Sequence, residues 1–200
     1  MANIDRPSGL KPVGTKGAAN WSGKVNMYAV ADDDTTAIFV GDLVKLAGTA
    51  GEAGEEIYGM DVEGMPEVTQ SAAGDKSVGV VVGFLANQDN LTTKHRAAST
   101  ARVALVSDDP DTIYEVQEVS GGTALTSTAV GNNANVVVGA GNATTGVSGM
   151  ELDNATEANT AGLNLQILSL SKKPDNNMGE HAKWLVMVND SEFRVGQTGT

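Results

Sequence analysis

The residue types that carry out most enzyme chemistry are scarce in this chain. It has no cysteine, which removes thiolate nucleophiles, disulfides, zinc–thiolate sites and iron–sulfur clusters. Its two histidines, His95 and His181, lie in different halves of the sequence, and no Gly-x-Ser-x-Gly nucleophile elbow occurs. A catalytic triad needs a base that is oriented by a carboxylate and lies beside a nucleophile. We therefore expect no catalytic residue and no enzyme activity, with His181 packing or capping beside the last strand.

Acidic side chains gather at two places that could attract a cation. One is Asp108-Asp109-Pro110-Asp111 and the other is the run 32–34. Calcium needs several converging oxygen ligands, but neither group has the residue spacing of an EF-hand loop. The alternative is a turn in which Asp side chains accept hydrogen bonds from their own backbone while Pro110 fixes φ. We expect turns with no metal and no cofactor, and calcium binding at 108–111 stays open as the alternative.

Charge and composition exclude several classes of partner. The net charge is −12, and the 13 lysines and arginines are scattered, which disfavours binding to nucleic acid. Aromatic residues make up 4% of the chain, too few for a broad surface that stacks sugars or bases. The N-terminus has no apolar segment and no long apolar stretch occurs, so we expect no membrane contact and synthesis in the cytoplasm.

The composition favours an all-β fold. Glycine accounts for 24 of the 200 residues and charged residues for 19%, and valine, threonine, alanine and asparagine are abundant, which is poor material for helices. Short apolar or alternating runs are separated by Gly, Asn and Asp turns, as in a compact β-barrel or β-sandwich, with a jelly roll possible. A short helix could form only at 89–98. The expected strands span 25–30, 37–40, 43–46, 78–85, 102–106, 113–119, 136–138, 163–170 and 184–188.

Residues 1–24 differ from the rest and are predicted to form an extended N-terminal arm, followed by a β-rich domain over 25–200 with long Gly-rich loops. Prolines and glycines punctuate the arm, and its large apolar side chains are Leu10, Val13 and Trp21. Such a segment is either frayed or laid along a surface of its own chain or a neighbour. An indole favours docking, because exposure at a disordered end stabilises nothing.

Four groups of short strand and turn segments follow one another along nearly the whole chain: 6–14 with 21–24, 39–44 with 78–84, 108–110 with 114–118, and 183–189 with 192–194. In their order, these segments resemble a family of tailed-phage virion proteins, the capsid decoration or cement proteins.

The resemblance implies a β-rich protein on the capsid exterior that bridges subunits of the phage major capsid protein and associates with itself as a homodimer or homotrimer. It supplies no catalytic motif. A glycan- or receptor-binding β-module of a head fibre or tail is the alternative. The arm should carry contacts, so truncating residues 1–24 is expected to weaken capsid binding and leave the β-rich domain folded. The candidate contact residues are Arg6, Leu10, Lys11, Val13, Trp21, Lys24, Phe193 and Arg194.

Overall fold

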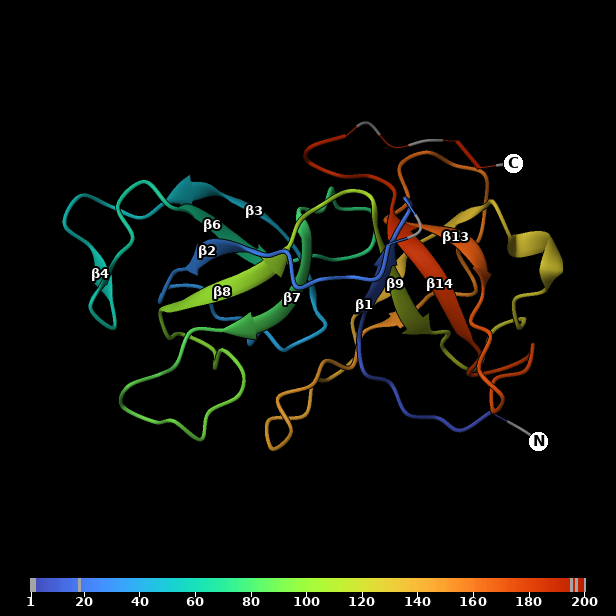
Figure 1. Cartoon of the computed structure of the whole chain (residues 1–200), viewed down its shortest axis with the longest axis horizontal. Helices are drawn as coiled ribbons and strands as arrows, with labels where there is room; N and C mark the ends of the chain where they lie inside the picture. The colour runs from blue at the N-terminus through green and yellow to red at the C-terminus, as the bar shows by residue number, and fades with distance from the viewer. Residues whose placement is uncertain (1–2, 18, 195, 197, 200) are drawn as a thin grey trace.

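The computed structural model describes residues 3–17, 19–194, 196 and 198–199, and these are nearly all β. The predicted all-β fold is confirmed, and one short 3-10 turn, η1 (Ser127–Ala129), is the helical element of the described chain. The strands form two main bodies, a closed barrel and a five-stranded sheet, which lie side by side along the longest axis of the molecule (Figure 1).

The barrel is built from the first half of the chain. Its strands are joined in the order β2-β6-β3-β7-β8, with antiparallel pairing except between β2 and β6. Their valines suit a closed barrel, because β-branched side chains pack well on a pleated surface and fill the interior. The bounds are β2 (Asn26–Val30), β3 (Leu43–Ala50), β6 (Pro66–Gln70), β7 (Gly79–Phe84) and β8 (Arg102–Ser107).

The second body is the antiparallel sheet β1-β9-β14-β13-β10. Trp184 and Tyr114 lie at the centre of its core, both essentially without solvent exposure. A two-stranded sheet of β11 and β12 lies near it, linked through a bridge between Glu118 and Leu152. The bounds are β1 (Lys11–Thr15), β9 (Thr112–Gln117), β10 (Asn133–Ala134), β11 (Val136–Val137), β12 (Glu151–Leu152), β13 (Leu165–Leu170) and β14 (Lys183–Val188).

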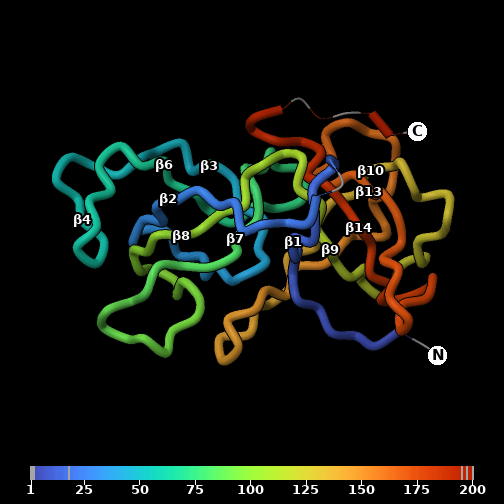
Figure 2. The backbone as a smooth tube through the Cα atoms, viewed as in Figure 1, coloured from blue at the N-terminus to red at the C-terminus, as the bar shows by residue number. Residues whose placement is uncertain are grey.

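The order of the elements makes the barrel an insertion in the sheet. The chain lays down β1, crosses to the barrel for β2 to β8, and returns to pair β9 with β1 (Figure 2). A small hairpin of β4 (Glu56–Ile57) and β5 (Met60–Asp61) projects from the far end of the barrel. The arm therefore lies on the chain's own surface over residues 11–15, as the edge strand of the sheet.

Some elements differ from the sequence expectation. The segment 37–40 contributes isolated bridges from Ile38 to Arg96 and from Val40 to Val147 instead of a strand. The segment 89–98 forms turns rather than a helix. Strand β6 was not predicted, because its sequence PEVTQ begins with proline and offers one large apolar side chain, Val68, which enters the barrel core.

Candidate functional site

The arm is fixed to the molecule where it passes over the start of the barrel. Leu10 donates its backbone N–H to the carbonyl oxygen of Gly41 at 2.9 Å. At Gly9, with φ of 63°, an added Cβ would lie 2.5 Å from that same oxygen and 2.6 Å from the Cβ of Ser148. Only a residue without a side chain allows this approach. The Leu10 side chain is 1% exposed and packs in a cluster that includes Leu43 of the barrel and residues of the sheet.

The buried carboxylate of Asp42 lies next to Gly41, the residue to which the arm is hydrogen-bonded. Asp42 is 1% exposed, and its Oδ2 accepts hydrogen bonds from the Phe39 amide at 2.8 Å and from Gln70 Nε2 at 2.9 Å. Its Oδ1 accepts from the hydroxyl of Ser148, whose oxygen accepts from the Met150 amide. Burial raises the pKa of Asp42, although these hydrogen bonds oppose the shift. The network fixes the 39–42 turn against the 148–150 segment, and so fixes the surface on which the arm lies.

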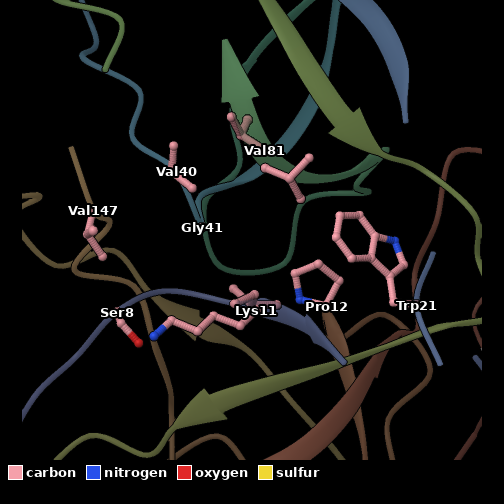
Figure 3. Close-up of a pocket in the computed structure, with 10 residues that line it drawn as sticks. Ser8, Lys11, Pro12, Trp21, Val40, Gly41, Val81 and Val147 are labelled. Carbon is pink, nitrogen blue, oxygen red and sulfur yellow. The ribbon is translucent and has the colours of Figure 1, made fainter. Parts of the chain in front are cut away.

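An apolar groove of about 230 Å³ lies between the arm and the barrel. Pro12 and Trp21 form one side and Val81 lies across from them, while the aliphatic part of Lys11 runs along the rim toward Ser8 (Figure 3). The centre of the groove is apolar, and Lys11 supplies one cationic group at its edge. The lining residues are Ser8, Leu10, Lys11, Pro12, Trp21, Val40, Gly41, Val81, Val82 and Val147.

The predicted contact residues of the arm differ in exposure: one is buried and the others are exposed or partly exposed. Leu10 is buried in the chain's own core, which corrects its assignment as a contact residue for a partner. Lys11 is exposed beside the groove, Val13 is 41% exposed at the bulge in β1, and Trp21 is partly exposed. Lys24 is exposed, with its Nζ 3.9 Å from a carboxylate oxygen of Asp109.

Arg6 lies away from the groove, at the beginning of the arm. Its side chain is exposed, and its backbone N–H donates to Gln117 Oε1 at 3.0 Å. Near the other end of the chain, Phe193 is 55% exposed. Arg194 is partly exposed, and its guanidinium donates to Asp111 Oδ1 at 2.9 Å and to the Pro110 carbonyl at 3.0 Å.

The acidic segment 108–111 forms the turn that the sequence predicted. Asp108 accepts hydrogen bonds from the Tyr28 hydroxyl at 2.7 Å and from the side chain of Asn26. Burial, with help from Asp108, raises the pKa of Tyr28. Asp109 Oδ1 accepts from the backbone N–H of Asp111, and Asp111 pairs with Arg194. Each of these carboxylates therefore binds a donor of the protein itself.

The histidines lie in unrelated surroundings. His95 stacks on Phe39 with ring centroids 4.7 Å apart and an interplanar angle of 7°. Burial, followed by the charge of Arg102, lowers the pKa of His95. His181 precedes β14 in a left-handed conformation, near Asp5. Among the described residues, neither histidine side chain hydrogen-bonds to a serine or threonine hydroxyl.

The sequence did not predict that Val81 and Val82 of the barrel line the groove. The run 78–85 was predicted as a buried strand, but Val82 turns toward the groove beside a register shift between Val81 and Gly83. Val147, from a loop far away in the sequence, is placed beside the groove by its β-bridge to Val40. Neither contribution has a local sequence signal, since both depend on pairing between remote segments.

The comparisons with other proteins give no family. No protein-family model, no curated protein and no solved structure matches this chain. In the part of the chain that the structure describes, no helix has the length and apolar character needed to cross a membrane.

Proposed function

We propose that this protein is a structural component of a phage virion, bound to the outer surface of the assembled capsid. It bridges subunits of the major capsid protein, self-associates as a homodimer or homotrimer, and uses no cofactor, nucleic acid or membrane. It is synthesised in the host cytoplasm and then joins the particle. The support is the resemblance in the order of the sequence segments, together with the surface formed by the arm.

The observation that carries the proposal is the contrast between this surface and the rest of the molecule. Residues 1–24 hold four cationic side chains and one acidic side chain, in a chain whose net charge is −12. Lys11 and Lys24 are exposed there, together with Val13 and the groove beside Trp21. A surface with an apolar centre and a cationic rim suits a protein partner that offers an apolar side chain and acidic groups.

Such a contact strengthens a shell by mass action. A ligand that binds the assembled state and not the free subunits shifts the equilibrium toward assembly in proportion to its affinity and concentration. An extended strand such as β1, already fixed by its pairing with β9, loses little conformational freedom on binding. The arm thus adds contacts without the entropic cost of ordering a loose terminus.

Binding to shells tests the proposal directly. Purified protein is mixed with undecorated, expanded shells of the major capsid protein encoded in the same genome, and co-sedimentation and shell melting temperature are measured. The wild type should co-sediment and raise the melting temperature. Lys11→Glu should weaken binding by about tenfold or more, because reversing one rim charge costs on the order of 1.4 kcal/mol. Absence of binding by the wild type would overturn the proposal.

The matched control is Lys172→Glu, which makes the same charge change at an exposed lysine outside the groove. It should bind shells like the wild type. Equal weakening by both variants would show that net charge, and not the arm surface, governs binding. Retention on a glycan array, without shell binding, would instead favour a receptor-binding module of a head fibre or tail.

A further inference from the structure

Three potential metal ligands converge where the arm begins, although they are far apart in the sequence. Asp5 belongs to the arm, Glu151 to β12, and His181 to the loop before β14. One ligand atom from each lies within 4.8 Å of the others, and Asp5 Oδ1 is 3.6 Å from His181 Nδ1. Within the described residues, no other three acidic or histidine side chains bring their ligand atoms this close together.

The side-chain amide of Gln117 lies in the middle of these three atoms. Its Nε2 is 3.0 Å from Asp5 Oδ1, 3.2 Å from Glu151 Oε1 and 3.4 Å from His181 Nδ1. An amide nitrogen carries two hydrogens and faces three acceptors when His181 Nδ1 is unprotonated. In that tautomer the three atoms include one more acceptor than this amide can satisfy, and a cation bound among them would be its partner.

A cavity of about 180 Å³ borders the cluster at His181, with Asn3, Arg6 and Asp175 also on its wall.

We propose that Asp5, Glu151 and His181 form a binding site for a divalent transition-metal ion of the Zn²⁺ class. One imidazole nitrogen and two carboxylate oxygens match the ligands that this class takes, whereas Ca²⁺ takes six to eight oxygens. Tetrahedral Zn²⁺ with bonds of about 2.0–2.1 Å holds its ligand atoms roughly 3.3 Å apart, close to the spacing of Asp5 and His181. Gln117 rotates to present Oε1 or yields its place to a water molecule.

Such an ion would fasten the first residues of the arm to the sheet. In the metal-free cluster they are held by hydrogen bonds, from Asn3 Nδ2 to the carbonyls of Asn177 and Glu180 and from the Arg6 amide to Gln117. A metal bridge joins the arm, β12 and the loop before β14 at one point. The site does not depend on the proposed function, and shell binding and metal binding are measured separately.

Titration calorimetry of the full chain, freed of metal with a chelator, tests the site with ZnCl₂ alone. The wild type should take up one equivalent, and Asp5→Asn and His181→Asn should each weaken binding at least about tenfold. Both variants should fold, since Asp5 is exposed and asparagine tolerates the left-handed φ of 58° at position 181. Asp175→Asn, at an exposed acid on the wall of the adjoining cavity, is the control and should bind like the wild type.

Hydrogen exchange supplies a readout that separates this site from surface adsorption of zinc. Saturating Zn²⁺ should slow amide exchange of residues 4–8 in the wild type and leave it unchanged in Asp5→Asn. No uptake of zinc by the wild type would overturn the proposal. Uptake that is equal in the wild type and in both ligand variants, or that leaves exchange of the arm unchanged, would overturn it as well.

Discussion

At the scale of single residues, backbone contact at Gly9 decides how the arm is attached. Gly9→Ala forces a Cβ to within 2.5 Å of the Gly41 oxygen in a left-handed conformation. We expect a loss of at least about 2 kcal/mol, or roughly 4–8 °C in Tm, measured by thermal unfolding. Gly17→Ala is the control, because its Cβ would meet only Thr15 Oγ1 at 4.0 Å. An equal Tm for both variants would contradict the close approach.

A second residue-scale prediction concerns Glu115 on β9. Burial alone would raise the pKa of Glu115, but the Lys173 ammonium at 2.7 Å and the Ser171 hydroxyl at 2.6 Å outweigh it and hold the pKa below its usual value. Because the folded-state pKa is depressed, the stabilisation is present at neutral pH and is lost as pH falls through the folded-state value.

Lys173→Met should therefore lower stability at pH 7 by about 1 kcal/mol, a modest value because the ammonium is half exposed. The difference from the wild type should shrink as the pH falls below about 4, where Glu115 is protonated in the unfolded chain. Urea unfolding across this range measures it. Lys172→Met, at the neighbouring exposed lysine, should change little at any pH, and a constant deficit for Lys173→Met would contradict the assignment to Glu115.

At the scale of elements, the arm is part of the fold as well as the proposed contact surface. β1 pairs with β9 along the edge of the sheet, and Leu10 fills a core shared by sheet and barrel. Deleting residues 2–16 should therefore cost more than about 3 kcal/mol, since losing one buried leucine costs about 2–5 kcal/mol. The expectation that removal of residues 1–24 leaves the rest folded is revised accordingly.

The shorter deletion of residues 2–8 separates the first residues of the arm from the part that packs in the core. It keeps Gly9, Leu10 and β1, so Tm should fall by no more than a few degrees, while the longer deletion unfolds at much lower temperature. Circular dichroism on both proteins gives the comparison. If the longer deletion melted like the full chain, Leu10 and β1 would contribute nothing to the core.

The sequence predicted those elements whose signal is local. Strands with clean alternation or continuous valine, such as β7, β8, β9 and β14, lie where the pattern placed them, and Trp184 is core. β1 was not found because its sequence KPVGT contains proline and glycine, and it exists through pairing with β9. The groove and the Asp5 cluster were missed for the same reason: the groove combines residues from four separate segments and the cluster from three.

At the scale of the whole molecule, acidic side chains gather around one cavity near the β4–β5 hairpin, which Figure 1 shows at the end of the barrel away from the sheet. A cavity there of about 340 Å³ is lined by carboxylates. Within the described chain, none of them forms an ion pair, and Lys45 is the one cation between residues 25 and 75. The carboxylates are Asp32, Asp33, Glu52, Glu55 and Glu67.

Mutual repulsion of these carboxylates should make the protein more stable in salt. Raising NaCl from about 0.01 M to about 1 M shortens the Debye length from about 30 Å to about 3 Å, which screens the repulsion. We expect Tm to rise over that range, and Glu52→Gln with Glu55→Gln to raise Tm at low salt and reduce the salt effect. Glu192→Gln, at an exposed acid away from this cavity, is the control and should leave the salt effect close to that of the wild type. A Tm that falls with salt would mean that attractive pairs such as Lys45 with Asp75 outweigh the repulsion. The carboxylates at this end of the barrel would then not lower the stability of the free protein.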